Sequence, residues 1–264
     1  MPIPERLKPA FAAARAPEAG KLHDARSRLM VALDVPSAKA ASEMVKKLDG
    51  TCTWFKVGME LFTAAGPAAV ELLVKRGHSV FLDLKFHDIP NTVAGAVRSA
   101  AGLGVRMVNV HAAGGPAMLA AAREALAGIA DPPELLAVTV LTSMDTAQLR
   151  AAGVGRAPAD QVELLAKMAL KTGIRGFVCS PEEVAALRRL TGSEGVLVTP
   201  GIRPAGVNAG DQKRLATPAH ALRHGASYLV VGRPITQAAD PAAAAEAIVE
   251  EMAAALSAQP VYSH

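Results

Sequence analysis

The chain has 264 residues, of which 51% are hydrophobic, 20% charged and only 3% aromatic, and its formal net charge is +4. This composition is typical of a globular protein with a large core and excludes a disordered chain. Scarce aromatic residues and the lack of a dense Lys/Arg run disfavour nucleic-acid binding, whereas the mild basic excess suits an anionic small molecule. No apolar run approaches the roughly 18 residues of a membrane-spanning helix, so we expect no membrane association.

The first 27 residues include Glu5, Glu18 and Asp24 and lack the continuous apolar stretch of a secretory signal. We interpret them as an N-terminal extension, a short helix or a loose arm, that covers one domain formed by residues 28–264. The two cysteines, Cys52 and Cys179, have neither a CxxC partner nor a metal-ligand spacing. They are typical of reduced, buried thiols and predict a cytoplasmic protein.

From Arg28 onward, short apolar runs alternate with longer Ala/Leu-rich amphipathic segments. The runs are nearly continuous in Val, Leu and Ile, as in strands buried on both faces. They cover 29–35, 54–58, 79–85, 107–112, 134–141, 176–180, 196–202 and 228–235. Helices are predicted near 38–48, 61–76, 91–102, 116–128, 159–172, 182–190, 217–224 and 241–256.

Eight strand–helix units predict an α/β fold, a single-domain (β/α)8 TIM barrel, for which about 250 residues is a common length. The alternative is an open, doubly wound sheet. Such a sheet normally has a GxGxxG turn after its first strand, and here that turn reads Asp34-Val35-Pro36-Ser37. The barrel is therefore favoured.

The most informative segment closes the third predicted strand, where Asp83-x-Lys85-x-x-Asp88 follows an apolar run. Burying charge is costly unless the charges pair or do chemistry. Residues two apart on a strand project to the same side, so Asp83 and Lys85 should lie together, with Asp88 just beyond in the turn. An acid, a base and an acid held together can set one another's pKa and deliver a proton. Pro90 then suits the first position of the next helix.

Other polar residues also fall at predicted strand ends, where barrels of this kind place their sites. They are Asp34, Lys56, Asn109, His111, Thr142, Ser143, Thr199, Arg203 and Arg233. Asp34 and Lys56, on neighbouring strands, could join Asp83 and Lys85 in an alternating charge array that keeps each member ionised. A purely structural ion-pair network is the alternative.

A phosphate site is predicted after the eighth strand, at Gly232 and Arg233. Glycine allows close backbone approach, arginine supplies a fork of donors, and barrels often bind phosphate after strands seven and eight. The long polar loop that runs on from Arg203 and contains Gln212 has the character of a mobile lid. A solvated surface arginine is the alternative.

No spacing of histidines, cysteines or acidic residues predicts a metal site, so we expect neither metal nor cofactor. His87 should point away from Asp83 and Lys85, and His111 could line the barrel mouth. There is also no GxSxG nucleophile elbow and no P-loop.

Seven segments between about Leu29 and Thr236 form a recognisable set: VALDVP, FKVGMELF, FLDLKFHDIPNT, VNVHAAGG, VLTSM, TPGIRPAG with DQKR, and VVGRPIT. In order and spacing, this set resembles the orotidine 5′-phosphate decarboxylase family. DxKxxD alone is shared with related phosphosugar decarboxylases, but the whole set is far more specific. Residues 1–27 lie outside the resemblance.

The resemblance implies conversion of orotidine 5′-phosphate to UMP and CO2 in de novo pyrimidine biosynthesis, without a cofactor, by a homodimer with shared active sites. Lys85 is then expected to donate a proton to C6 of the pyrimidine, with Asp83 set against the substrate carboxylate. Asp88 and Thr92 are expected to reach the partner's site. The implied substrate ligands are Asp34 and Lys56 for the ribose, Thr142 and Ser143 for the base, and Arg203, Gln212, Gly232 and Arg233 for the phosphate and lid.

Two other functions fit parts of this pattern. Metal-dependent 3-keto-gulonate-phosphate decarboxylases and hexulose-phosphate synthases keep DxKxxD, but they resemble this chain less because their second strand carries an acidic metal ligand where this chain has Lys56. A cation at that position would repel Mg²⁺. A non-catalytic nucleotide-binding barrel is disfavoured by the intact set of Asp83, Lys85 and Asp88.

Overall fold

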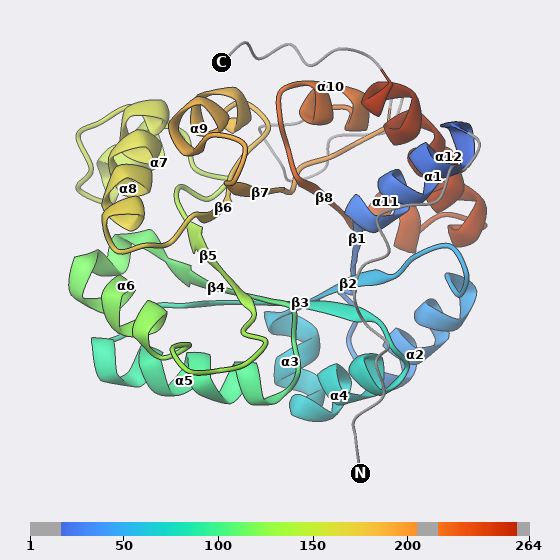
Figure 1. Ribbon diagram of the computed structural model, residues 1–264, viewed down its shortest axis with the longest axis horizontal. Coiled ribbons are helices and arrows are strands. Elements are labelled where there is room, and N and C mark those ends of the chain that lie inside the picture. The colour runs from blue at the N-terminus through green and yellow to red at the C-terminus, as the bar shows by residue number, and fades with distance from the viewer. Residues whose placement is uncertain (1–16, 205–215, 258–264) are drawn as a thin grey trace.

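The computed structural model describes residues 17–204 and 216–257. Eight parallel strands form a closed barrel in chain order, with β1 paired to both β2 and β8 (Figure 1). The strands are β1 (Leu29–Ala32), β2 (Trp54–Gly58), β3 (Ser79–Phe86), β4 (Met107–His111), β5 (Glu134–Val138), β6 (Gly176–Val178), β7 (Val196–Thr199) and β8 (Tyr228–Val231). The predicted (β/α)8 TIM barrel is thus confirmed.

Helices surround the barrel on the outside (Figure 1). They are α1 (Pro17–Arg28), α2 (Ala38–Lys47), α3 (Met59–Ala65), α4 (Pro67–Lys75), α5 (Pro90–Gly102), α6 (Gly115–Glu124), α7 (Thr146–Ala151), α8 (Pro158–Lys171), α9 (Val184–Thr191), α10 (Pro218–Arg223), α11 (Arg233–Thr236) and α12 (Pro241–Leu256), with a 3₁₀ turn η1 (Ala112–Gly114). Pro90 begins α5, as its position after the charged motif predicts.

Three features of the helices differ from the sequence prediction. The single helix expected over 61–76 is two helices, because Gly66 adopts a positive φ of 62° and Pro67 starts a new helix. The short helices α7 and α11 were not predicted. Six and four residues are too few to produce a clear apolar periodicity.

Most strands are also shorter at their carboxyl ends than predicted. The ladders stop at Ala32, Val138, Val178, Thr199 and Val231, whereas the apolar runs continue for two to four residues. These extra residues open the loops at the mouth of the barrel. Hydropathy alone does not distinguish a buried strand from the buried first residues of such a loop.

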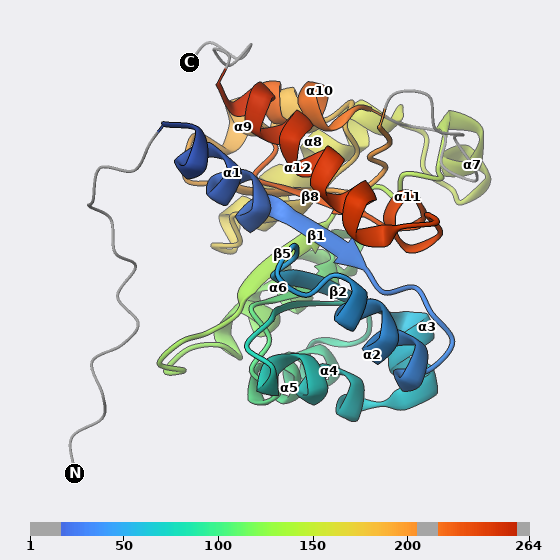
Figure 2. The same ribbon diagram turned by 90° about the vertical axis from the view of Figure 1, so that its right-hand side faces the viewer.

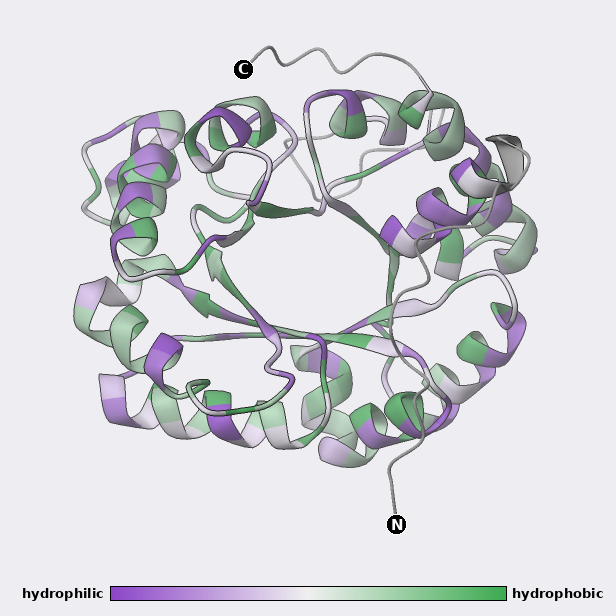
Figure 3. Ribbon diagram, in the orientation of Figure 1, coloured by the Kyte–Doolittle hydropathy of each residue, from purple (hydrophilic) through white to green (hydrophobic). Residues whose placement is uncertain are grey.

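The barrel has two hydrophobic cores. One lies between strands and helices; the other fills the barrel interior with Met30, Ala32, Phe81, Met107, Leu136, Val198 and Val230. The strands are mostly hydrophobic, whereas the helices alternate hydrophilic and hydrophobic residues (Figure 3). The interior is therefore a packed plug beneath the mouth rather than a pore.

Helix α1 is the described part of the predicted N-terminal extension, and residues 1–16 lie outside the described residues. It lies along α12 (Figure 2), and Arg26 forms an ion pair of 2.7 Å with Glu246 of that helix. Arg26 also donates a hydrogen bond to the Gly50 carbonyl. The boundary between residues 27 and 28 stays a prediction. Within 17–204 and 216–257, no helix has both the length and the apolar character needed to cross a membrane.

Candidate active site

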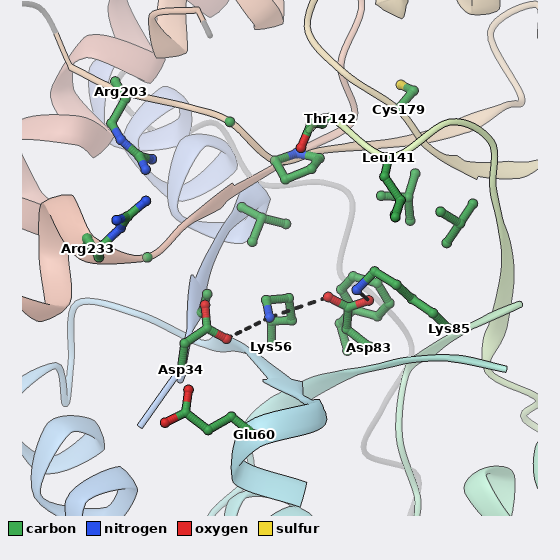
Figure 4. A pocket seen from close by; sticks show the side chains of 18 of the residues that line it. Asp34, Lys56, Glu60, Asp83, Lys85, Leu141, Thr142, Cys179, Arg203 and Arg233 are labelled. Carbon is green, nitrogen blue, oxygen red and sulfur yellow. Dashed lines mark hydrogen bonds and ion pairs between the residues drawn. The ribbon is translucent and has the colours of Figure 1, made fainter. Parts of the chain in front are cut away.

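A pocket of about 440 Å³ opens at the carboxyl ends of the strands, where the sequence predicted a site. Its volume lies in the range of small-molecule sites. Among its lining residues are predicted site residues from six separate parts of the chain: Asp34, Lys56, Asp83, Lys85, Thr142, Arg203, Gly232 and Arg233. Figure 4 shows most of these side chains around one cavity.

Four charged side chains form the predicted alternating array. Lys56 Nζ lies 2.9 Å from Asp34 Oδ1 and 3.4 Å from Asp83 Oδ2. Lys85 Nζ lies 2.6 Å from Asp83 Oδ1. The order is therefore carboxylate, ammonium, carboxylate, ammonium, with the middle two members supplied by adjacent strands β2 and β3 (Figure 4).

Mutual attraction keeps the buried centre of this array ionised. Burial alone would raise the pKa of Asp83, but the charges of Lys56 and Lys85 outweigh it and hold that pKa below 3.8. Burial would likewise lower the pKa of Lys56, but Asp83 and Asp34 raise it above 10.5. The stability that ionised Asp83 contributes is present above its unfolded pKa and is lost as the pH falls through its depressed folded pKa. The stability that the charged form of Lys56 contributes is lost only as the pH rises through its raised folded pKa.

The contact between Asp83 and Lys85 was predicted correctly, but the backbone that makes it is not a regular strand. Lys85 has φ 53°, the one described non-glycine residue at positive φ. The register with β4 shifts between Leu82 and Phe86. A left-handed, non-glycine residue costs about 1–3 kcal/mol and persists only where its surroundings fix it.

Asn109 of β4 supplies that fixation, and the sequence reasoning gave it no role beyond a place at a strand end. Its Oδ1 accepts a hydrogen bond of 2.8 Å from the Lys85 backbone N–H. Its Nδ2 donates one of 2.7 Å to Asp83 Oδ1. The sequence did carry one signal: residues two apart on a strand face the same side, and Asn109 is two residues from Met107, which faces the barrel interior.

Glycine at position 58 gives the array the space that it needs. A Cβ there would lie 2.9 Å from Lys56 Nζ and 3.2 Å from Asp34 Oδ1. Any larger residue would therefore displace the ammonium from its carboxylate. This position was not among the predicted site residues, and FKVG offers no signal of its own for the requirement.

Two arginines define the opposite side of the pocket. Arg203 and Arg233 point into the same space, from the side of the cavity opposite Lys85 (Figure 4). Arg203 follows β7 and is buried, whereas Arg233 begins α11 directly after Gly232. The pocket is thus bipolar, with cations for an anionic group at one side and the charge array at the other.

Some predicted ligands are not brought to this pocket. Thr142 lines it, but the neighbouring Ser143 is exposed and is not among the lining residues. Gln212 lies outside the described residues. Asp88 and Thr92 are exposed on the surface and do not line the pocket of their own chain. The Asp88 carboxylate accepts a hydrogen bond of 2.6 Å from the Ile89 N–H.

The histidines near the motif form a pair beside the array. The rings of His87 and His111 have centroids 5.4 Å apart, and neither ring lines the pocket. Burial, and then the neighbouring His87 and Lys85, lower the pKa of His111. In the described ranges, no cluster of three or more histidine, cysteine or acidic residues is placed to hold a metal ion.

Fold and site together define a (β/α)8 barrel with a buried array of alternating charges facing a pocket that has two arginines at its far side. The class is an enzyme that uses fixed charges and proton transfer on a small molecule with an anionic group. The chain belongs to the Orotidine 5'-phosphate decarboxylase / HUMPS family, whose sequence pattern matches residues 27–248.

Curated relatives and solved structures agree with this assignment. The chain is 55% identical over 234 residues to the orotidine 5'-phosphate decarboxylase of Moorella thermoacetica, covering 86% of this chain and 93% of the relative. It is 57% identical over 228 residues to that of Halorhodospira halophila, covering 86% and 97%. The crystal structure of the Lactobacillus acidophilus enzyme of the same name has a TM-score of 0.74 at 43% identity, covering 85% of this chain and 98% of that one.

Proposed function

We propose that this chain decarboxylates orotidine 5′-phosphate to UMP and CO2 in de novo pyrimidine biosynthesis. The observation that carries the proposal is the array Asp34–Lys56–Asp83–Lys85 at one side of a pocket whose other side holds Arg203 and Arg233. A nucleoside monophosphate has its anionic group and its reacting base at opposite ends, with the ribose between them. The family pattern matches residues 27–248, which include all of these side chains, and the relatives named for this activity align with 86% of this chain.

Lys85 is the proton donor in this proposal. When the bond from C6 to the carboxylate breaks, CO2 leaves and the electron pair stays on C6, in the ring plane and outside the π system. The Lys85 ammonium stabilises that pair without reorganisation and then transfers a proton from Nζ to C6. Solvent returns a proton to the amine. Asp83, 2.6 Å from Lys85 Nζ, orients the ammonium and faces the substrate carboxylate.

The remaining pocket residues hold the substrate. Arg203 and Arg233 bind the phosphate, because guanidinium groups match its oxygens with paired hydrogen bonds. Gly232 lets the phosphate approach the backbone closely; a Cβ there would face Ala32 Cβ at 3.5 Å and Asp34 Oδ2 at 3.7 Å. Asp34 and Lys56 contact the ribose hydroxyls. Thr142 contacts the base, and Ser143 and Gln212 complete the proposed set.

The active form in this proposal is a homodimer with shared sites. Asp88 and Thr92 belong to the motif segment but are exposed and lie outside their own pocket, and in this proposal they reach the partner's pocket. Two large apolar side chains support an interface at this end of the barrel: Ile89, 66% exposed after β3, and Met59, 57% exposed after β2. Such side chains are stabilised when a partner covers them.

The second candidate is the metal-dependent phosphosugar decarboxylase or synthase activity that shares the DxKxxD pattern. It is disfavoured by the position of Lys56, whose ammonium lies between Asp34 and Asp83 at 2.9 and 3.4 Å. An ammonium placed there satisfies the two carboxylates that a divalent cation would otherwise use, and it repels such a cation.

The test is an absorbance assay of orotidine 5′-phosphate loss with pure protein, with UMP identified as the product. Lys85→Ala serves as the matched inactive control. Turnover of a phosphosugar in place of orotidine 5′-phosphate would reject the proposal. The buried thiols Cys52 and Cys179 suit a reducing compartment, so we place the reaction in the cytoplasm, which cell fractionation would test.

A further inference from the structure

Asn109 lies fully buried in the barrel interior, on the strand next to the one that carries Asp83 and Lys85. Met107, two residues earlier on β4, belongs to the interior core, so the Asn109 side chain faces inward above that plug. A buried amide is costly unless its polar atoms find partners. Both ends of this amide are hydrogen-bonded, and both partners are members of the charge array.

The first partner is the backbone of Lys85. Leu82 pairs with Val108 and Phe86 with Val110, so three residues of β3 face the single residue Asn109 of β4. The regular ladder is interrupted there. The Lys85 N–H donates to Asn109 Oδ1 at 2.8 Å instead, and Lys85 adopts φ 53°. The side chain of Asn109 thus replaces a backbone acceptor at the point where β3 departs from its strand geometry.

The second partner is the carboxylate of Asp83. Asn109 Nδ2 donates to Asp83 Oδ1 at 2.7 Å, and Lys85 Nζ lies 2.6 Å from the same oxygen. One amide therefore fixes both the carboxylate and the backbone of the lysine that contacts it. An amide suits this place because it carries a donor and an acceptor on one short side chain at every pH, whereas a carboxyl of the same length has a donor only when it is protonated.

We propose that Asn109 is a positioning residue for the decarboxylation proposed above: it holds Asp83 and Lys85 in the geometry that places the Lys85 ammonium at the reacting carbon. The role rests on that proposed function. Asn109 does not line the pocket, so it acts through its two neighbours rather than by contact with substrate.

This role predicts a separation of catalysis from binding. Arg203 and Arg233 lie on the other side of the pocket and do not depend on Asn109 (Figure 4). Asn109→Ala removes one hydrogen bond to a charged group and one to a strained backbone, so kcat should fall roughly 10- to 100-fold. The Kd for UMP, measured by calorimetry, should stay within about threefold, since its phosphate contacts remain.

Asn109→Asp provides a readout that a packing role would not move. The introduced carboxyl can still accept from the Lys85 N–H, but ionised it faces the Asp83 carboxylate without a donor. A proton shared between the two carboxyls restores that donor. The ratio of the variant's kcat to the wild-type kcat should therefore rise as the pH is lowered from about 8 to about 5.

The matched control is Thr139→Val. Thr139 is also buried at the carboxyl end of a neighbouring strand, but its hydroxyl bonds to the Val178 carbonyl at 3.4 Å and it does not line the pocket. We expect kcat within about twofold of wild type for this variant. All values of kcat are normalised to the number of UMP-binding sites, so that a partly unfolded preparation does not imitate a catalytic defect.

The outcomes separate the two proposals. Wild-type protein that does not turn over orotidine 5′-phosphate overturns the proposed function and this role with it. Active wild type with unchanged kcat in Asn109→Ala overturns the role alone. So does a parallel loss of kcat and UMP affinity, or a flat pH ratio for Asn109→Asp, because each indicates packing rather than positioning.

Discussion

The proposed sharing of active sites between subunits makes a quantitative prediction about mixed dimers. Lys85 lines the pocket of its own chain, whereas Asp88 is exposed and does not. If Asp88 serves the partner's site, each site takes Lys85 from one chain and Asp88 from the other. Homodimers of Lys85→Ala and of Asp88→Ala should each be nearly inactive. In a mixed dimer, one site collects both defects and the other is wholly native.

The expected recovery follows from two-fold symmetry. Random pairing of equal amounts makes half of the dimers mixed, and half of the sites in those dimers are native. Activity should therefore return to about a quarter of the wild-type value. The two variants would be co-expressed with different tags, mixed dimers verified by sequential purification, and orotidine 5′-phosphate turnover measured.

The structure supplies a matched control for this complementation. Asp83 and Lys85 are in contact at 2.6 Å within one chain. Mixing Lys85→Ala with Asp83→Ala must therefore leave every site defective and restore no activity. Failure of the Lys85/Asp88 mixture to recover, despite verified mixed dimers, would refute the reasoning and place Asp88 in the site of its own chain.

Three further predictions concern the pocket. Arg233→Ala should lower kcat/KM for the phosphorylated substrate by roughly 10- to 100-fold, with little effect on a substrate that lacks the phosphate. The matched control is Arg223→Ala, because Arg223 is an exposed arginine that does not line the pocket. An equal loss with both substrates would exclude Arg233 as the phosphate ligand. Activity should survive exhaustive EDTA treatment, whereas a loss that Mg²⁺ restores would favour the metal-dependent alternative. Burial raises the pKa of Asp83, and the Lys56 charge is the largest influence that lowers it. Lys56→Gln should therefore raise the pKa of Asp83 and move the acid limb of the kcat/KM profile to higher pH. An unmoved limb would show that Asp83 does not set that limb.

The barrel could be predicted because its strands are buried on both faces and therefore have nearly continuous apolar sequences. All eight strands lie within the predicted runs, apart from one additional residue at the end of β3. The charge array could also be predicted, because closing the barrel brings β2 and β3 together and places Lys56 next to Asp83. Short elements such as α11 could not, because their conformation depends on the turn that precedes them rather than on periodicity.

The conformation of Lys85 marks the limit of that reasoning. Strict alternation along β3 predicts that Asp83 and Lys85 point the same way, and they do meet, but through a left-handed residue at a register shift. No property of a lysine indicates positive φ, because the cause lies on another strand, in Asn109. Parity along β4 predicts that Asn109 faces inward. It does not predict that its amide completes the ladder of β3, since that requires knowing where β3 leaves its regular geometry. The position of the proposed proton donor is thus a tertiary property, set by a residue 24 positions away.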